Sequence, residues 1–307
     1  MNTPLILEIK HNSLDDGQGI RSVVFVKGCP LNCIWCHNPE SKSALAQISF
    51  DKSKCIGCKT CLRECQYGAL VPGLDTFIDR EKCTLCFKCA SKCPARALEK
   101  IGKNMTVDEI LNEVISDKIF YDTSGGGVTL SGGEVCMFPE WTGNLAAQLK
   151  ANGINVLIET CGFFDYSKVS EYILPYVDTI FYDIKLFDSQ KHKEYCGVYN
   201  DSVLSNFVTL HNNMKDFGFS LLPRVPLIPN ITDTDDNLSS IAAFLSEENV
   251  SKVQLLPYNP TWYNKAEKIG TKPAIMLQEL RSFPAKEQIE HAKSFFTDKN
   301  INVGGSI

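Results

Sequence analysis

Short apolar runs alternate along this chain with segments of helical periodicity. Six runs rich in β-branched and aromatic residues are bounded by glycine or polar residues, and this pattern predicts strands. The runs span residues 22–27, 128–130, 155–159, 179–184, 220–225 and 252–256. Between most of these runs, apolar residues recur every three to four positions, which predicts amphipathic helices. The helical patterns cover residues 106–115, 141–149, 166–174, 238–247 and 285–298.

Two of the helices carry further signals. Thr106 and Glu109 form a Thr-x-x-Glu capping box in front of an apolar pattern, which marks the point where a helix begins. The last helix, 285–298, is expected to bury one face. That face consists of Ile289, Ala292, Phe295 and Phe296.

The alternation of strands and helices predicts parallel strands joined by right-handed crossovers. Six such strands predict an α/β fold, namely a partial (β/α)6 barrel similar to a TIM barrel. Side chains that perform chemistry then belong on the loops at the carboxyl ends of the strands. Three candidates follow strands in this way: Cys29 after the first, Gly132 after the second and Thr160 after the third.

The composition is ordinary for a soluble globular protein, with 307 residues, 44% hydrophobic and 22% charged. A net charge of −5 argues against general affinity for nucleic acid or anionic membrane. Residues 1–10 lack the basic region and long apolar run of a signal peptide. No apolar stretch reaches the roughly 20 residues that cross a bilayer. We therefore expect a cytoplasmic protein without nucleic-acid or membrane partners.

Eight of the 14 cysteines form a duplicated C-x-x-C-x-x-C-x-x-x-C run. The first run is Cys55, Cys58, Cys61 and Cys65, and the second is Cys83, Cys86, Cys89 and Cys93. A lysine precedes both runs and an Ala-Leu pair closes each, so the similarity extends beyond the cysteines. Zinc sites pair two C-x-x-C knuckles across a longer gap, which disfavours zinc. Disulfides are the other alternative, but metal-ligand spacing without an export signal favours thiols in a reducing cytoplasm.

The duplicated run resembles a bacterial two-cluster ferredoxin, in which the fourth cysteine of each run ligates the other cluster. The resemblance implies two four-iron four-sulfur (4Fe-4S) clusters. One would be held by Cys55, Cys58, Cys61 and Cys93, and the other by Cys83, Cys86, Cys89 and Cys65. Residues 50–100 are therefore expected to form a ferredoxin-like insert in a barrel made of residues 1–49 and 101–307. The length and ligand density of the insert suit a domain folded around metal.

A second cysteine motif, C-x-x-x-C-x-x-C, comprises Cys29, Cys33 and Cys36. Three thiolates can hold three irons of a four-iron cluster and leave the fourth open for a small molecule, much as catalytic zinc keeps an open position. A zinc knuckle or unrelated free thiols are the alternatives. With Trp35 before the last cysteine, the loop resembles that of the radical S-adenosylmethionine (SAM) superfamily, in which SAM chelates the open iron. Such a cluster is sensitive to oxygen, which indicates an anaerobic setting.

Four further motifs extend the resemblance over nearly the whole chain. They are DGQGIR at 16–21, SGGGVTLSGGE at 124–134, YDIKL at 182–186 and LLPY at 255–258. Together with the cysteine loop they resemble the activating enzymes of glycyl radical enzymes, in the branch with a ferredoxin-like insert. The resemblance implies an oxidoreductase that reductively cleaves SAM to a 5′-deoxyadenosyl radical and abstracts a hydrogen from a glycine of a partner glycyl radical enzyme. It also implies flavodoxin or ferredoxin as the reductant.

The resemblance further implies where SAM binds. Gly132 and Gly133 would let the backbone approach the methionine moiety, and Glu134 would contact its amino group. Asp183 and Lys185 flank Ile184 and point to one face, similar to the pair that contacts SAM and its carboxylate. Trp35, Cys36 and His37 would lie near adenine, and Asn259 near the nucleoside. Arg224 would contact the carboxylate or the ribose. The resemblance also implies a monovalent-cation site made of Glu159, Thr160 and Asp183.

A few positions depart from the family pattern or lie outside it. Gln18 and Val135 replace the usual proline, and Asn259 stands where many members have histidine. The cysteines outside the motifs, Cys136, Cys161 and Cys196, are expected to be buried free thiols. The acidic stretch 233–236 lacks EF-hand spacing and is expected to be a solvated loop.

Two other functions compete with this one. Radical SAM enzymes such as the anaerobic sulfatase-maturing enzymes carry their extra cysteines after the barrel, whereas no cysteine follows Cys196 here. A ferredoxin-like electron carrier fused to a structural barrel would leave the three-cysteine loop and Glu134 without a purpose. Within the leading interpretation, the insert is expected either to relay electrons or to provide a docking surface.

Overall fold

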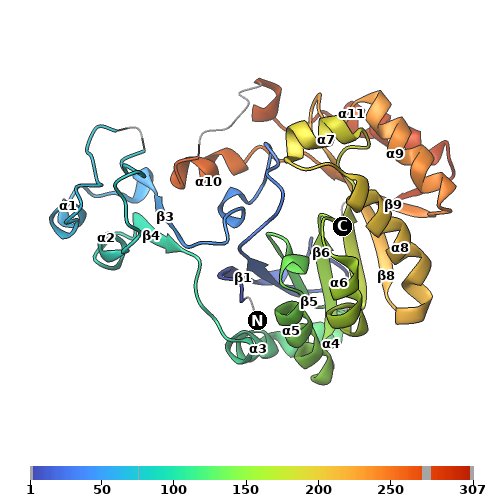
Figure 1. The fold of residues 1–307 in the computed structure, drawn as a ribbon, viewed down its shortest axis with the longest axis horizontal. Helices are drawn as coiled ribbons and strands as arrows, with labels where there is room; N and C mark the ends of the chain where they lie inside the picture. The colour runs from blue at the N-terminus through green and yellow to red at the C-terminus, as the bar shows by residue number, and fades with distance from the viewer. Residues whose placement is uncertain (1–2, 75, 272–277, 305–307) are drawn as a thin grey trace.

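An eight-stranded sheet organises the protein, whose computed structural model describes residues 3–74, 76–271 and 278–304 (Figure 1). The strand order is β1-β2-β5-β6-β7-β8-β9-β10. The strands are β1 (Ile6–Ser13), β2 (Arg21–Val26), β5 (Gly127–Gly132), β6 (Asn155–Thr160), β7 (Thr179–Asp183), β8 (Ser220–Leu227), β9 (Lys252–Pro257) and β10 (Asn302–Gly304). The strands from β2 to β9 pair in parallel, which confirms the six predicted strands and the parallel α/β fold.

The two outer strands of the sheet lie outside the predicted set. β1 pairs antiparallel with β2, and β10 pairs parallel with β9. β1 contains Lys10, His11 and Asn12 in sequence, and β10 is only three residues long. Short or polar edge strands lack the apolar run that identifies a buried strand, so the sequence pattern does not reveal them.

Helices pack along the strands, and Figure 1 shows α5, α6, α8 and α9 beside β5 to β9. The helices of this part are α3 (Val107–Val114), α4 (Lys118–Ser124), α5 (Pro139–Ala151), α6 (Tyr166–Tyr172), α7 (Ser189–Cys196), α8 (Asp201–Phe217), α9 (Asp235–Glu247), α10 (Trp262–Lys268) and α11 (Lys286–Thr297). Five of them, α3, α5, α6, α9 and α11, match the predicted helices. In α8 the buried Val203, Phe207 and Leu210 have helical spacing, so the sequence contained a signal that the prediction missed.

The helix boundaries show which local signals were informative. The hydroxyl of Thr106 accepts a hydrogen bond from the Glu109 amide at 3.2 Å, and the Glu109 carboxylate accepts one from the Thr106 amide at 2.7 Å, which confirms the capping box. The prediction of a solvated loop at 233–236 was wrong, because Thr234 caps α9 and the helix begins at Asp235. In α11, Ala292 and Phe296 are buried, as predicted, whereas Ile289 and Phe295 are half-buried.

One apolar core joins the sheet to its helices. Val24, Leu130 and Ile158 contribute from the strands, and Ile110 and Leu145 contribute from α3 and α5. All five side chains are at most 1% exposed. Close packing on this scale fixes the strands relative to one another, so the loops at their carboxyl ends start from a rigid base.

The cysteine-rich segment is framed by an antiparallel pair of strands, β3 (Gln47–Phe50) and β4 (Leu98–Ile101). Between them lie two short helices, α1 (Thr60–Glu64) and α2 (Lys88–Ser91). The residues before these helices, Lys59 and Phe87, both adopt left-handed backbone, with φ of 58° and 57°. The duplicated sequence therefore has a duplicated backbone. Figure 1 shows this segment projecting from one side of the sheet.

The projecting segment has a small core of its own, which consists of Ile48, Leu70, Ile78, Cys89 and Leu98. Five side chains are few for a segment of this length, as expected where ligand binding contributes to folding. The extent of 50–100 and the ferredoxin-like character of the segment stay predictions.

Helix α10 lies between the projecting segment and the rest of the protein (Figure 1). Lys265 donates a hydrogen bond to the Asn38 side chain at 2.9 Å. One turn later, Lys268 forms an ion pair with Asp51 at 2.8 Å. The helix thus contacts both sides of the point where the chain enters the segment.

No helix within the described ranges combines the length and apolarity needed to cross a bilayer.

Candidate active site at the carboxyl ends of the strands

The loop that carries Cys29, Cys33 and Cys36 begins where β2 ends and is closed at its base by backbone hydrogen bonds. The Gly28 amide donates to the Ser41 carbonyl at 2.7 Å, and the Cys29 amide donates to the Lys42 carbonyl at 3.1 Å. The ammonium of Lys42 then reaches across the loop to the Cys33 carbonyl at 2.7 Å. These contacts hold all three thiols on one compact turn.

The end of α7 supports the same loop from the side. The Asn32 amide donates to the Cys196 carbonyl at 2.7 Å, and the Ile34 amide donates to the Tyr195 carbonyl at 3.1 Å. The last carbonyls of a helix lack partners within the helix, so they are available as acceptors. An apolar cluster that includes Leu31, Trp35, Leu186, Tyr258 and Trp262 packs around the loop. Neither α7 nor Lys42 was identified from the sequence, because no motif spacing marks either.

The three thiols of the loop are close neighbours. Burial raises the pKa of Cys36 to about 12, and the nearby Cys33 adds to this effect. A hydrogen bond from Cys196 lowers the pKa of Cys33 to about 7. Three adjacent free thiols suit a cluster of soft iron ions, because thiolates are the usual protein ligands of iron–sulfur clusters.

The cysteines outside the motifs divide by environment. Cys136 and Cys196 are buried free thiols, as predicted, with exposures of 4% and 0%. Cys161 is half-buried instead, and it lies within hydrogen-bonding reach of Cys29. Two of these thiols, Cys161 and Cys196, therefore adjoin the cysteine loop.

The Gly-Gly turn after β5 is packed directly against the loop. A Cβ on Gly132 would lie 2.6 Å from the Val26 carbonyl oxygen, and one on Gly133 would lie 2.1 Å from the Gly28 carbonyl oxygen. Gly132 also has a φ of +103°, a conformation that side chains rarely allow. The prediction gave SAM approach as the reason for glycine here. The structure gives another reason, which is contact with the backbone of Val26 and Gly28.

Glu134 does not face an open space. Its side chain is 0% exposed, and its carboxylate accepts hydrogen bonds from the Thr160 hydroxyl at 2.9 Å, the Cys136 amide at 2.9 Å and the Cys161 amide at 2.7 Å. The predicted contact between this carboxylate and the SAM amino group stays a prediction, and the carboxylate already has three protein donors. Glu134 instead ties the turn after β5 to the turn after β6.

A row of charged side chains crosses the ends of β6, β7 and β8. Arg224 contacts Glu159 at 2.5 Å and Asp183 at 2.9 Å, and Lys185 donates to Asp183 at 2.8 Å. Ser131 adds a hydrogen bond to Glu159 at 2.5 Å. The guanidinium also lies 5.0 Å from the ring centroid of Phe181. Four strand-end charges predicted from the sequence are thus brought into contact.

Burial and pairing set the charges of this row. Burial alone would raise the pKa of Asp183, but Arg224 and Lys185 outweigh that effect and hold it below its ordinary value. Burial likewise opposes the charge of Lys185, and Asp183 nevertheless raises the pKa of its ammonium. Asp183 and Lys185 therefore both stay charged near neutral pH. The row also influences the cysteine loop, since the charges of Lys185 and Asp183 act on the pKa of Cys33.

The predicted cation site has a guanidinium at its centre. Glu159 and Asp183 both bind Arg224, and Thr160 donates to Glu134 rather than pointing toward them. Within the described ranges, no three His, Cys, Asp or Glu side chains converge closely enough to hold a single metal ion. The monovalent cation stays a prediction.

The remaining predicted SAM contacts surround the same end of the sheet. Trp35 is 4% exposed and its ring lies 6.5 Å from that of Tyr195, whereas His37 is exposed with its ring 5.8 Å from that of Tyr258. Ile184 is buried, and its amide donates to the Arg224 carbonyl at 2.8 Å. Asn259 is exposed and accepts from the Thr261 amide at 3.0 Å, which places it at the turn before α10.

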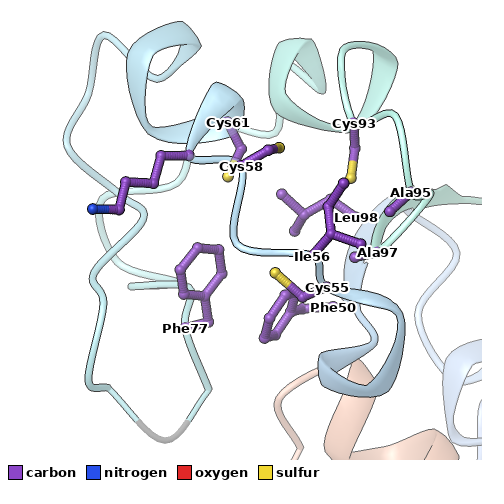
Figure 2. Close-up of a pocket in the computed structure, with 11 residues that line it drawn as sticks. Phe50, Cys55, Ile56, Cys58, Cys61, Phe77, Cys93, Ala95, Ala97 and Leu98 are labelled. Carbon is purple, nitrogen blue, oxygen red and sulfur yellow. The ribbon is translucent and has the colours of Figure 1, made fainter.

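In the projecting segment, four cysteines line one hollow that is partly open to solvent. They are Cys55, Cys58, Cys61 and Cys93, the set expected to share one cluster. Figure 2 shows Cys58 and Cys61 approaching from one side and Cys93 from the chain beyond α2. Burial raises the pKa of Cys61, and its three companions add to the effect. Four thiols that line one hollow are a donor set of the kind that holds an iron–sulfur cluster.

The second expected set also comes together. Burial raises the pKa of Cys89 to about 11, and the nearby Cys83, Cys65 and Cys86 contribute. Cys65 belongs to the first run in sequence, so the fourth cysteine lies with the opposite run. Likewise, Cys93 of the second run lies with the cysteines of the first run. Each fourth cysteine thus lies with the opposite run, as predicted. Their role as iron ligands stays a prediction.

Comparisons with known proteins show which family the chain resembles in sequence. A model of the Radical SAM superfamily matches residues 23–239. The chain is 37% identical over 310 residues to the trans-4-hydroxy-L-proline dehydratase activating enzyme of Clostridioides difficile, covering 98% of this chain and 99% of that protein. It is 38% identical over 274 residues to the choline trimethylamine-lyase activating enzyme of Oleidesulfovibrio alaskensis, covering 87% of each. It is 36% identical to the benzylsuccinate synthase activating enzyme of Thauera aromatica, over 96% of this chain and 90% of that protein.

A similarity among solved structures concerns the fold alone. A radical SAM methyltransferase from Sphaerobacter thermophilus has a TM-score of 0.54 with this structure, at 13% identity over 99% of this chain and 77% of that one.

Proposed function

Because this chain belongs to the radical SAM superfamily and, within it, to the activating enzymes of glycyl radical enzymes, we propose how its residues perform that activity. The enzyme reductively cleaves SAM to a 5′-deoxyadenosyl radical, which abstracts a hydrogen atom from a glycine of a partner glycyl radical enzyme. The observation that carries the assignment of residues is the proximity of the cysteine loop to the charged row at the ends of β6, β7 and β8, since the charges of Lys185 and Asp183 act on Cys33.

Cys29, Cys33 and Cys36 would hold a 4Fe-4S cluster, which when bound supplies the single electron for SAM cleavage. Lys185 uses one of its three donors on Asp183, and its remaining donors suit the SAM carboxylate. Arg224 anchors Glu159 and Asp183, so it keeps the row rigid before SAM arrives. Burial of the row excludes water and strengthens each of these electrostatic contacts.

Glu134 acts as a positioning residue in this proposal. Its buried carboxylate holds Thr160 and Cys161 against the Gly-Gly turn, so the backbone of that turn is fixed beside the cysteine loop. The SAM amino group would then meet backbone atoms of Gly132 and Gly133 rather than the Glu134 carboxylate. Trp35, Cys36, His37 and Asn259 complete the site around the nucleoside, as the resemblance implies. Ile184 is buried and shapes the backbone between Asp183 and Lys185.

Two further 4Fe-4S clusters belong to the proposal, which gives three in all. The hollow lined by Cys55, Cys58, Cys61 and Cys93 supports one of them. The proximity of Cys83, Cys86, Cys89 and Cys65 supports the other. A monovalent cation at Glu159, Thr160 and Asp183 would share its carboxylates with Arg224. We further propose a cytoplasmic, anaerobic setting with flavodoxin or ferredoxin as the reductant.

The test is formation of the glycyl radical itself. The reconstituted protein, SAM and a reductant are mixed without oxygen with a candidate glycyl radical enzyme, and the glycyl radical is recorded by electron paramagnetic resonance (EPR). We expect a glycyl radical together with 5′-deoxyadenosine. A partner whose radical glycine is replaced by alanine is the control and should give no signal. Cleavage of SAM without any radical on the unmodified partner would contradict the assignment.

A further inference from the structure

Charge is distributed unevenly between the projecting segment and the rest of the chain. Residues 50–100 contain 10 of the 31 Lys and Arg residues and 6 of the 36 Asp and Glu residues. The segment therefore carries a formal charge of +4, while the remaining residues carry −9. A compact basic unit on an acidic protein creates a local positive potential that the net charge of −5 conceals.

Most cations of this segment are exposed, whereas most of its described acids are half-buried. Nine cationic side chains are exposed. They are Lys52, Lys54, Lys59, Arg63, Lys82, Lys88, Lys92, Arg96 and Lys100, and we call them the basic face. Among the described acidic residues of 50–100, only Glu81 is exposed. Asp51 is already paired with Lys268 of α10 at 2.8 Å.

Ion pairs do little to neutralise the basic face. Within the described part of the segment, the only one of its nine side chains with an ion-pair partner is Lys82, which lies 3.1 Å from Asp79. Lys100 instead lies over the ring of Phe87, 5.1 Å from its centroid. Holding like charges together is unfavourable, so an exposed face of this kind favours a partner of opposite charge.

Several cations of the basic face lie next to the cysteine sets in the structure or in the sequence. Lys59 lines the hollow that contains Cys55, Cys58, Cys61 and Cys93. In sequence, Lys54 precedes Cys55 and Lys92 precedes Cys93. Three of the eight cysteines, Cys55, Cys58 and Cys86, are exposed. Ile56, between two of these cysteines, is 68% exposed and provides an apolar contact at the same place. A protein bound here would bring its own redox group close to the cysteine sets.

We infer that the basic face is the docking surface for an acidic one-electron carrier protein. This inference rests on the proposed function, since it assumes that the cysteine sets hold redox clusters. In the encounter the carrier loses one electron and is oxidised, and the segment gains that electron and is reduced. No covalent bond forms or breaks. Opposite charges would steer the encounter and align the carrier over the exposed cysteines.

The experiment measures binding directly, with an acidic bacterial flavodoxin as the probe. Binding of oxidised flavodoxin to the reconstituted protein is recorded by calorimetry at about 50 mM and about 200 mM salt, because screening weakens contacts between exposed charges. We expect the affinity to fall with salt. A Lys52→Glu, Lys88→Glu, Lys92→Glu variant should bind about tenfold or more weakly and lose most of the salt dependence.

The matched control reverses three exposed lysines outside the segment, Lys215→Glu, Lys252→Glu and Lys299→Glu. This variant has the same net charge as the test variant and should bind flavodoxin within about twofold of the parent, because the contacts that matter are local. The test variant could lose iron. In that case flavodoxin affinity is measured instead for Lys→Gln substitutions at the same three positions, and for the unmodified protein over the salt series.

Two results would overturn the inference. One is flavodoxin affinity that changes neither with salt nor with charge reversal in the segment. The other is salt-dependent binding of double-stranded DNA to the basic face that flavodoxin does not displace, which would assign the face to nucleic acid. A second assay, SAM cleavage with a small-molecule reductant, tests the proposed function separately from the docking inference. The test variant should still cleave SAM in this assay. If the parent protein does not cleave SAM in it, the proposed function itself is contradicted.

Discussion

At the scale of single residues, Arg224 determines the arrangement of the candidate site. Its guanidinium joins the carboxylates of Glu159 and Asp183, which come from two different strands, at 2.5 and 2.9 Å. Removing one partner of a buried charge network leaves the others without compensation, and this costs more than loss of an exposed pair. The site is therefore expected to be sensitive to substitutions that leave Cys29, Cys33 and Cys36 untouched.

Substitution of Asp183 tests this sensitivity. Asp183→Ala should retain all clusters but bind SAM more weakly, by on the order of 1.5–3 kcal/mol, because Lys185 and Arg224 lose the group that positions them. The measurement is calorimetric SAM binding together with iron analysis. Asp122→Ala is the control, since it breaks only an exposed pair with Lys118, and it should leave SAM affinity unchanged. Equal affinity in both variants would remove Asp183 from the site.

Sequence motifs singled out these residues, which the structure brings together at the strand ends, but did not give all their contacts. Spacing identified Asp183 and Lys185 as neighbours on one face, because strand periodicity is local. The pairing of Glu159 with Arg224 depends on strand order, which spacing alone does not give. Glu134 was assigned to SAM, whereas its carboxylate binds three protein donors. Motif resemblance preserves the position of a residue, but it does not tell which atoms of that residue make the contact.

At the scale of elements, edge strand β1 depends on side-chain contacts at its outer end. The Asp117 carboxylate accepts from the Ser22 hydroxyl of β2 at 2.5 Å and contacts the His11 ring of β1 at 2.5 Å. The hydrogen bond to Asp117 raises the pKa of His11 above its ordinary 6.5, against a smaller opposing effect of burial. Strand β1, which the sequence pattern did not reveal, is thus joined to β2 and the turn before α4.

This contact predicts how stability depends on pH. Because the folded pKa of His11 is raised, its stabilisation is complete below about pH 6.5 and is lost as the pH rises through the folded pKa. His11→Gln should therefore lower the thermal midpoint more at pH 6 than at pH 8.5. The loss should stay within about 1 kcal/mol, since His11 is partly exposed and screened. Thermal unfolding under anaerobic conditions provides the measurement.

The control for this prediction is His211→Gln in α8. His211 stacks on Phe207, and within the described residues it has no acidic partner. Its effect on the thermal midpoint should be similar at both pH values. A His11→Gln effect that grows with increasing pH would show that the charged pair is not the cause.

At the scale of the whole molecule, one segment of duplicated sequence projects from the sheet and is connected to the cysteine loop by α10. The crossing of Cys65 and Cys93 between the two sets could be anticipated from the resemblance to a two-cluster ferredoxin, in which the fourth cysteine of each run belongs to the other cluster. The role of α10 could not, since Lys265 and Lys268 meet Asn38 and Asp51 across more than 200 residues of sequence. No local pattern encodes contacts of that range.

The contact that α10 makes with both the projecting segment and the cysteine loop raises the question of whether the segment relays electrons to that loop. Cys58→Ala should disrupt one cluster while sparing Cys29, Cys33 and Cys36. If relay is the role, this variant binds SAM normally but turns over slowly with a protein reductant, and a strong small-molecule reductant restores much of the cleavage. Unchanged activity with the protein reductant would reject the relay. Slow turnover with both reductants, despite an intact SAM-binding cluster, would favour a structural role.

The central claim is that the loop of Cys29, Cys33 and Cys36 is the centre of SAM cleavage and is separate from the eight cysteines of the projecting segment. The most direct measurement compares iron content and 5′-deoxyadenosine formation in the parent and in the triple alanine variant of the loop. We expect about twelve irons in the parent and about eight in the variant, with SAM cleavage only in the parent. A parent with four irons, zinc in the segment, or a variant that still cleaves SAM would contradict the central claim.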